Sequence, residues 1–548
     1  MKELKQTRKC IGIDLGTTNT SVAISSLDSY DRIVLDDVTV QMRTDGRGGS
    51  KHILPSIIYY SYDTDLKVGY EARGYKDADN KKGNPNGEHY IENSKRSMGT
   101  ETKWLVDGRL FTPVDVAATI LERIAKTRDI KNVIDDADVF ITIPASFSQS
   151  AITDTEIAAK KAGFKNVKLH EEPKAAILSY LHSEMDKRPG DRILDITTPK
   201  RILVVDIGGG TCDICLQDIC LKDGEISIER FPMANRDDIG GLDFDMRIEA
   251  YLYKKYNVQN GINEQNRPQL LDAARAIKEA VSDKINEDIE YEFEEEDTEF
   301  CKDKLWKKKI SQLGGVSHYL IELGNLEITV EEFIEIIEPL IKDNGVISKT
   351  KDESDMNKNI QSLIQRTLDE NSVTAETVDF FFLTGGMAKC FALKAMLYEL
   401  FETEIISPKE PFYAVSRGAA LINKYPLIAA ANDKMTNSVL MEMDDGSLYP
   451  LIEAGASIPE YNRIVDKTFR TTSRAGVSIA LYEGKNAYDC GLKKIIHTYS
   501  IEFDTVQELG REFVIKYSID ESKKIEFELE FLDNGEKYKI EAGIKEDK

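Results

Sequence analysis

Two stretches far apart in the chain share one pattern of hydrophobic and polar positions. The first, residues 11–24, reads IGIDLGTTNTSVAI, and the second, residues 202–216, reads ILVVDIGGGTCDICL. In each stretch an apolar run ends in Asp and one more apolar residue, a turn of Gly with Thr follows, and a second apolar run begins. This pattern predicts a β-hairpin. Because the hairpin occurs twice, we expect two lobes of similar build.

The segments that follow each hairpin alternate between helical and strand patterns. A helix is expected to begin at Thr112 and Pro113, since Thr caps a helix N-terminus and Pro is favoured at the first helical position. Further helices are predicted over residues 154–162, 173–181, 269–289, 330–341, 358–368 and 391–401, and strands over 139–144 and 378–383. Strands that alternate with helices indicate an α/β body, which we assign to residues 9–428.

The pattern changes in the C-terminal part of the chain. Residues 499–504, 513–519 and 525–531 alternate between apolar and polar positions, as strands with one buried face do. No helical periodicity appears in this part. We therefore predict an all-β sandwich domain over residues 438–548, joined to the body by a short linker at residues 429–437.

Length and composition describe a multidomain globular chain. It has 548 residues, of which 41% are hydrophobic and 31% charged, and its net charge is −24. Nucleic-acid phosphates are bound by basic patches, so the acidic balance argues against a nucleic-acid partner. No apolar run is long enough for a membrane-spanning helix, and the charged N-terminus has no apolar stretch behind it. We expect a cytoplasmic protein with no membrane partner.

The cysteines do not indicate a disulfide framework or a metal site. There are seven, an odd number scattered along the chain, as is typical of reduced thiols. Cys212, Cys215 and Cys220 form a C-x-x-C-x4-C motif. However, Cys212 and Cys215 fall on a predicted strand, where residues three apart point to opposite faces and cannot bind one ion together. We interpret them as packing residues.

The two glycine turns are suited to binding an anion. A turn of Gly and Thr offers backbone N–H groups with little bulk above them, and Thr17, Thr18 and Thr211 add hydroxyl donors. Asp14 and Asp206, at the ends of the leading strands, are placed to hold a hydrated divalent cation such as Mg²⁺. Neither the P-loop motif nor the G-x-G-x-x-G motif occurs in the chain. The hairpins therefore predict a different type of phosphate site.

Four motifs, taken in order, resemble those of the actin-like ATPase domain of DnaK-type chaperones, the heat-shock protein 70 family. They are IGIDLGTTN from Ile11, EPKAA from Glu172, DIGGGTCD from Asp206 and LTGGM from Leu383. The resemblance extends from about Lys9 to about Lys539. Three further motifs narrow it to this family, namely KR-x-MG at 95–99, IPASF at 143–147 and GGLDFD at 240–245.

The resemblance implies a role for each matching residue. Lys95 is expected to contact the γ-phosphate and the attacking water, and Glu172 to complete the shell of Mg²⁺ and water together with Asp14 and Asp206. The catalytic set is therefore Lys95, Glu172, Asp206 and Thr211. The remaining residues implied in ATP or ADP binding are Gly16, Thr17, Thr18, Asn19, Gly208, Gly209, Gly210, Lys278, Ser282, Gly385, Gly386, Met387 and Lys389. The alternative for Lys95 is a solvated surface lysine, and for Glu172 an acid favoured at a helix start.

Several positions depart from the family pattern. Arg275 stands where an acid is usual, Asn19 where an aromatic residue is frequent, and Met387 and Phe412 where small polar and acidic residues are typical. The usual linker, an Asp followed by leucines, is missing between Tyr425 and Val439. The sequence stops at Lys548, soon after the last predicted strand, so we expect no helical lid.

Three functions are compatible with these features. The first is an ATP-driven chaperone that binds unfolded or extended polypeptides and works with J-domain and nucleotide-exchange partners. The second is a small-molecule kinase on the same scaffold, and the third is a nucleotide-gated structural protein. The alternating C-terminal strands favour the first, because a kinase leaves them unexplained.

Overall fold

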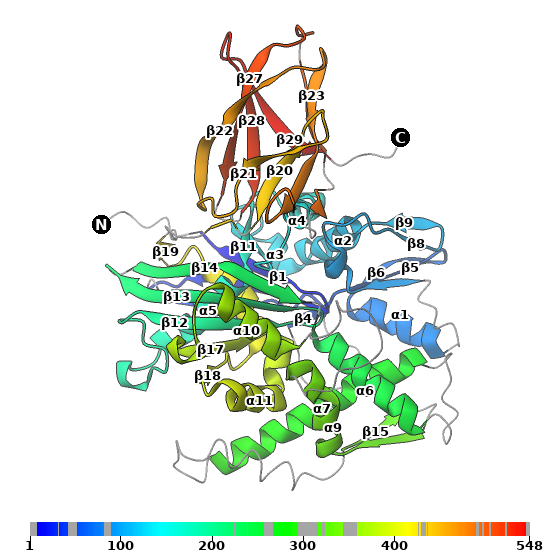
Figure 1. Cartoon of the computed structure of the whole chain (residues 1–548). Coiled ribbons are helices and arrows are strands. Elements are labelled where there is room, and N and C mark those ends of the chain that lie inside the picture. Colours follow the sequence, from blue (N-terminus) through cyan, green and yellow to red (C-terminus); the bar gives the residue numbers. More distant parts are fainter. Residues whose placement is uncertain are drawn as a thin grey trace.

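The computed structural model describes most of the chain. It covers residues 8–30, 32–41, 52–81, 89–223, 225–237, 239–256, 267–293, 316–320, 324–342, 359–425, 427–428, 434–435, 437–488, 493–495, 498–503, 506–520 and 523–543. Two mixed sheets with their helices form the lower body, and a β-rich unit lies above them (Figure 1). Most of the predicted linker lies outside the described residues.

The first sheet has the strand order β11-β10-β1-β2-β3, with β4 paired to β2. Its strands are β1 (Cys10–Leu15), β2 (Asn19–Leu27), β3 (Ile33–Asp37), β4 (Ile53–Pro55), β10 (Asp138–Ile143) and β11 (Val167–Glu171). Strands β1 and β2 form the first predicted hairpin, and β10 runs parallel to β1. The hairpin and the strand predicted at 139–144 are confirmed.

Helices and small sheets surround the first sheet. They are β5 (Ile57–Ser61), β6 (Thr64–Val68), α1 (Tyr70–Lys81), β7 (Tyr90–Glu92), the 3-10 helix η1 (Ser94–Ser97), β8 (Trp104–Val106), β9 (Arg109–Phe111), α2 (Pro113–Ala125), α3 (Arg128–Lys131) and α4 (Gln149–Lys161). Helix α2 begins as predicted, with the Thr112 side chain accepting from Asp115 N. Helix α4 begins five residues earlier than predicted, because the Ser148 hydroxyl caps it.

The second sheet repeats the plan, with the strand order β18-β17-β12-β13-β14-β19. Its strands are β12 (Lys200–Ile207), β13 (Cys212–Lys222), β14 (Glu225–Asp237), β17 (Phe380–Thr384), β18 (Ile405–Ile406) and β19 (Leu427–Ile428). Strands β12 and β13 form the second predicted hairpin, and β17 runs parallel to β12. Each sheet thus begins with an antiparallel hairpin whose first strand has a parallel neighbour.

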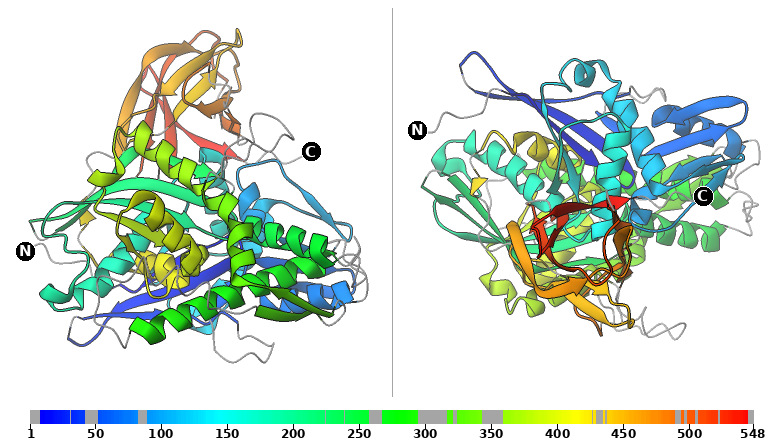
Figure 2. Two further views of the ribbon diagram at one scale, coloured as in Figure 1. Left: turned by 60° about the horizontal axis from the view of Figure 1, so that its bottom comes forward. Right: turned by 90° about the horizontal axis from the view of Figure 1, so that it is seen from above.

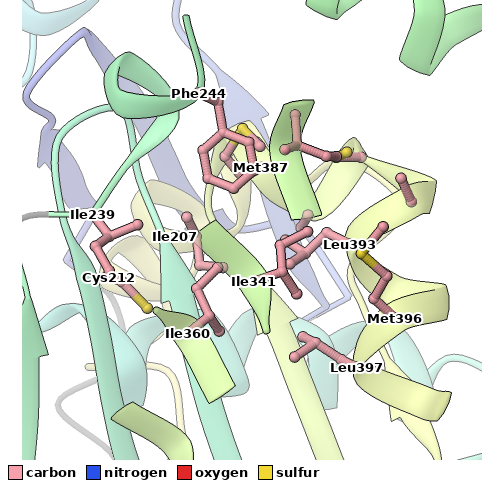
Figure 3. Packing of buried hydrophobic residues seen from close by; sticks show 14 of the residues in the cluster. Ile207, Cys212, Ile239, Phe244, Ile341, Ile360, Met387, Leu393, Met396 and Leu397 are labelled. Atoms are coloured by element: carbon pink, nitrogen blue, oxygen red, sulfur yellow. The ribbon is translucent and has the colours of Figure 1, made fainter. Parts of the chain in front are cut away.

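One face of this sheet is covered by helices that follow it in the chain. The remaining elements are η2 (Pro189–Asp191), α6 (Gly241–Tyr256), α7 (Arg267–Phe293), β15 (Val316–Leu320), β16 (Gly324–Ile328), α9 (Val330–Ile341), α10 (Ile360–Glu370), η4 (Ala375–Thr377), η5 (Gly386–Lys389) and α11 (Phe391–Phe401). Figure 3 shows the core between them, where Cys212 lies in the same apolar cluster as Ile239 and Ile360. Cys215 belongs to the core on the opposite face of the sheet, so the two thiols diverge as predicted.

Two long helices lie between the sheets. They are α5 (Glu172–Met185) and α12 (Pro411–Leu421), and their core takes residues from both sheets, including Phe140 of β10 and Phe382 of β17. The backbones approach closely here. A Cβ on Gly12 would lie 2.1 Å from Ser416 O, and one on Gly418 would lie 1.7 Å from Ala175 O. Glycine is required at both positions, because any side chain would push α12 away from its neighbours.

The C-terminal unit consists of two antiparallel sheets, β21-β20-β24-β25 and β22-β27-β28-β29-β26-β23. Its strands are β20 (Ser438–Glu442), β21 (Leu448–Ile452), β22 (Glu460–Arg470), β23 (Gly476–Ile479), β24 (Leu481–Gly484), β25 (Lys493–Lys494), β26 (Thr498–Glu502), β27 (Glu512–Ile519), β28 (Ile525–Phe531) and β29 (Lys537–Gly543). Both sheets contribute to one hydrophobic core. Figure 2, seen from above, looks down on the orange and red strands around that core.

Candidate functional site

The two glycine turns meet at the boundary between the two sheets. Gly16, Thr17 and Thr18 follow β1, and the turn from Gly208 to Thr211 follows β12. A Cβ on Gly209 would lie 1.9 Å from Thr18 Oγ1, so the turns are in direct contact. The glycines therefore allow the two backbone turns to approach one another closely, and turns of this kind can present N–H groups to an anion.

A cavity of about 360 Å³ lies at this junction. All but one of the residues implied by the resemblance line it, namely Asp14, Gly16, Thr17, Thr18, Asn19, Lys95, Glu172, Asp206, Gly208, Gly209, Thr211, Lys278, Ser282, Gly385, Gly386, Met387 and Lys389. The exception is Gly210, which is not among the lining residues and whose carbonyl accepts a hydrogen bond from Arg96. The carbonyl of Gly210 thus contacts a protein side chain, and the role of Gly210 in phosphate binding stays a prediction.

Lys95 and Glu172 form a buried ion pair at one end of the cavity. Lys95 Nζ lies 2.5 Å from Glu172 Oε1, and the side chains are 12% and 10% exposed. Burial alone lowers the pKa of Lys95, but the carboxylates of Glu172 and Asp14 outweigh it and raise the pKa. Lys95 is therefore a charged ammonium at neutral pH, and its low exposure excludes the reading as a solvated surface lysine.

Asp14 and Asp206 add further negative charge beside this pair. Burial, reinforced by the Glu172 carboxylate, raises the pKa of Asp14 to about 7. Burial and the carboxylates of Glu172, Asp213 and Asp14 raise the pKa of Asp206 well above its usual range. One ammonium does not balance these carboxylates, so the donor set fits a divalent cation. Within the described ranges no group of three His, Cys, Asp or Glu side chains is placed to bind one metal ion directly.

The other end of the cavity is formed by α7, the turn before η5, and α12. Lys278 Nζ donates to Gly241 O at 2.9 Å and lies 2.6 Å from Asp245 Oδ1. Ser282 Oγ donates to Lys278 O at 2.8 Å, so both predicted residues face one side of α7. On the opposite wall Gly385 has a φ of 78°, and a Cβ there would lie 2.4 Å from Ile207 O. This end is therefore a slot between a helix face and a backbone turn.

Three departures from the family pattern, Arg275, Met387 and Phe412, lie at this slot. Arg275 Nε donates to Asp245 Oδ2 at 3.0 Å, so one buried carboxylate binds both Arg275 and Lys278. The Phe412 ring lies against Gly386, and Lys389 Nζ lies 4.9 Å from the ring centroid. An aromatic ring and a cation thus form part of the wall, where the family typically has an acid.

Sequence reasoning gave no role to two residues that matter here. Asp213 lines the cavity and accepts a hydrogen bond from Ser146 Oγ, which comes from the loop after β10. Its signal was available, because it is an acidic residue two positions after Thr211, at the start of a strand whose next residues are apolar. Arg96 contacts the second glycine turn from the opposite lobe. No periodic pattern marks it, since it lies in a single turn of 3-10 helix.

The residue before Glu172 connects the cavity to the C-terminal unit. Glu171 is 3% exposed, with Arg230 Nη1 at 3.1 Å and Lys523 Nζ at 2.6 Å from its Oε1 atom. Lys523 lies in the turn between β27 and β28, and its ammonium also donates to Ala145 O at 2.6 Å. Nearby, Glu483 of β24 accepts from Gln149 N at 2.9 Å, at the first residue of α4. The β-rich unit therefore contacts the body through buried polar groups.

Comparison with known proteins assigns the family. The model of the Hsp70 protein family matches residues 10–319, more than half of the chain. The chain is 26% identical over 490 residues to the chaperone protein DnaK of Thermotoga neapolitana, covering 87% of this chain and 70% of the relative. The DnaK proteins of Thermosipho africanus and Carsonella ruddii are 24% and 26% identical, and they cover 87% and 82% of this chain.

Among the helices that the structure describes, none combines the length and the apolar character needed to cross a membrane. The two hairpins, the cavity between them and the match over residues 10–319 agree with one another. The chain therefore belongs to the Hsp70 family of ATP-dependent molecular chaperones.

Proposed function

We propose that the chain hydrolyses ATP in the cavity between its glycine turns, with Mg²⁺, and uses the reaction to control polypeptide binding by its β-rich unit. The observation that carries the proposal is the buried Lys95–Glu172 pair beside Asp14 and Asp206, directly at the junction of the two turns. Phosphoryl transfer requires little covalent chemistry from a protein, so charge neutralisation and positioning supply most of the catalysis.

In this proposal the turns hold the phosphates. The backbone N–H groups and hydroxyls of Thr17, Thr18 and the Gly208–Thr211 turn bind the β- and γ-phosphates, with Gly210 contributing through its place in the turn. Mg²⁺, when bound, neutralises charge on the phosphates. Asp14, Asp206 and Glu172 accept hydrogen bonds from its waters, while Lys95 contacts the γ-phosphate and orients the attacking water.

The slot at the far end takes the adenosine. Ser282 and Lys278 face it from α7, and the Gly385–Gly386 turn lets the ring approach the backbone. Met387 and Lys389 complete this wall on η5. Asn19 and Gly16 belong to the first turn and lie on the phosphate side of the proposed ligand.

The division of labour follows three parts of the chain. We assign ATP hydrolysis to residues 9–428, a short connection to 429–437, and binding of unfolded or extended polypeptides to 438–548. Two antiparallel sheets over one core support the last assignment, since extended peptides bind such units by main-chain pairing and apolar pockets. J-domain and nucleotide-exchange co-chaperones are the partners that this function implies.

Coupling between the two activities needs a physical contact. Lys523 supplies one, because it joins the β27–β28 turn to Glu171, which precedes Glu172, and to Ala145 in the loop that carries Ser146. A change in how the β-rich unit packs on the body therefore reaches Glu172, which lines the phosphate end of the cavity, and the loop whose Ser146 donates to Asp213. This contact operates without the leucine-rich linker that is missing from the sequence.

The test is ATP turnover by the full chain with and without a permanently unfolded polypeptide. The proposal predicts release of inorganic phosphate that requires Mg²⁺ and rises when the polypeptide is added. Transfer of the γ-phosphate to a small molecule would instead support a kinase. Nucleotide-dependent assembly without an effect of polypeptide would support a structural protein.

A further inference from the structure

Arg96 lies at the seam between the two lobes. It belongs to η1, in the lobe of the first sheet, and directly follows Lys95. Its Nη2 atom donates to Gly210 O and lies 3.1 Å from Asp243 Oδ2. Gly210 lies in the glycine turn after β12, and Asp243 lies in the first turn of α6. One side chain therefore connects the first lobe to two elements of the second.

The packing around this guanidinium is tight. A Cβ on Gly210 would lie 2.5 Å from Arg96 Nε and 2.7 Å from Thr17 Cγ2. In the part of the chain that the structure describes, Arg96 Nε is buried with no hydrogen-bond partner, because it faces the Gly210 backbone. Asp243 is fixed as well, since its Oδ2 atom also accepts from Gly240 N at 2.7 Å. A side chain at position 210 would therefore collide with both Arg96 and Thr17.

The position of Arg96 determines that of Lys95. Helix η1 has only four residues, Ser94–Ser97, so its two central side chains cannot move independently. Lys95 lines the cavity and pairs with Glu172, whereas Arg96 is not among the lining residues. An arginine that is held by two partners through its planar fork fixes the backbone from which the neighbouring lysine reaches the phosphate end.

We propose that Arg96 is a positioning residue for ATP hydrolysis that acts through Lys95. Its contacts with Gly210 and Asp243 join the two lobes, and they hold the Lys95 ammonium against Glu172. The inference rests on the hydrolysis proposed above. Because Arg96 does not line the cavity, its loss affects the rate of hydrolysis and leaves nucleotide binding nearly unchanged.

The test compares single-turnover ATP hydrolysis and ATP affinity in the full chain. We expect Arg96→Ala to lower the rate about tenfold or more, with the dissociation constant for ATP changed less than about threefold. Arg96→Lys keeps the charge but loses the fork, so we expect part of the rate to return. The control is Arg201→Ala, because Arg201 of β12 makes a two-point ion pair with Asp218 of β13, and neither residue lines the cavity.

A double-mutant cycle separates positioning from an independent contribution. In a Lys95→Ala background, Arg96→Ala should cause no further loss of rate, since the group that it positions is gone. Gly210→Ala tests the role of Arg96 in a second way. The added methyl group displaces the Arg96 guanidinium, while Arg96 keeps its charge.

The possible outcomes test the role of Arg96 and the proposed function separately. A parental rate in Arg96→Ala, or an equal loss in both backgrounds, overturns the role of Arg96 while the proposed function stands. Release of no phosphate by the parent chain overturns the proposed function and the inference with it. A rate loss confined to chains that contain Lys95, with ATP affinity retained, supports the inference.

Discussion

Lys523 Nζ lies 2.6 Å from Glu171 Oε1, and Glu171 is the residue immediately before Glu172 in the chain. The pair joins the β27–β28 turn of the C-terminal unit to the start of helix α5. Burial and the neighbouring Arg230 lower the pKa of Lys523, and the Glu171 carboxylate opposes this shift. A buried Lys523 ammonium without the Glu171 carboxylate would carry a large desolvation cost. The pair is therefore sensitive to how the β-rich unit packs on the body.

We predict that Lys523→Met uncouples the two parts of the chain. The methionine keeps the length of the side chain but can bind neither Glu171 nor Ala145 O, so movement of the β-rich unit no longer reaches the segment before Glu172. The ratio of ATP turnover with and without unfolded polypeptide should fall toward one. The matched control is Lys524→Met, since Lys524 pairs with Glu156 at 3.0 Å on α4 and does not contact Glu171 in the described residues. Equal loss in both variants would contradict a specific role for Lys523.

Binding of Mg²⁺ should depend on pH through Asp14. Its raised pKa of about 7 means that Asp14 carries a proton at pH 6 in the ligand-free chain and has lost it at pH 8. The ionised carboxylate accepts hydrogen bonds from the waters of the metal more strongly than the protonated acid does and adds a negative charge, so the apparent affinity for Mg²⁺ with ATP should be about tenfold weaker at pH 6 than at pH 8.

Calorimetric titration of Mg²⁺ at the two pH values measures this effect. Asp14→Asn should remove most of the difference, because an amide does not titrate. The exposed Asp195 is a suitable control, since the hydrogen bonds from Thr197 lower the pKa of Asp195 and keep it ionised at both pH values. The assignment fails if Asp14→Asn and Asp195→Asn show the same dependence on pH.

The close packing of α12 should make Gly418 essential for stability. Gly418→Ala places a methyl group 1.7 Å from Ala175 O, so helices α5 and α12 must separate. We expect a loss of about 3 kcal/mol or more in the free energy of unfolding. Gly74 lies on the exposed side of α1 with nothing within 4 Å of a Cβ, so Gly74→Ala should stabilise the chain by about 0.5–1 kcal/mol. Denaturant unfolding of both variants measures the contrast.

The parts of the fold that could be predicted from sequence are those with a local signal. The two hairpins, the cap at Thr112 and the alternating strands near Phe527 depend on residues close together in the chain. Helix α10 begins at Ile360, two residues later than predicted, because Asn359 acts as its cap. Helix α12 escaped prediction because nearly all of its residues are buried, so it shows no polar face.

The same distinction holds for the candidate site. Residues on the glycine turns could be identified from their motifs, since each motif is contiguous. Arg96 and Asp213 also lie in these motifs, but their roles could not be predicted, because those roles come from contacts with the opposite lobe. Phe412 was identified only as a departure from the family pattern. Its contact with Gly386 depends on how α12 packs, which no local pattern encodes.

The most direct test of the account separates ATP binding from ATP hydrolysis at Lys95. Lys95 is buried, charged and paired with Glu172 at the phosphate end of the cavity, while the other binding groups are mostly backbone. Single-turnover hydrolysis of bound ATP is measured for the full chain and for Lys95→Ala, with calorimetric ATP affinity measured in parallel. We predict that affinity stays within a few fold of the parent and that the rate falls by about 10²–10³. Hydrolysis by Lys95→Ala at the parental rate would contradict the account.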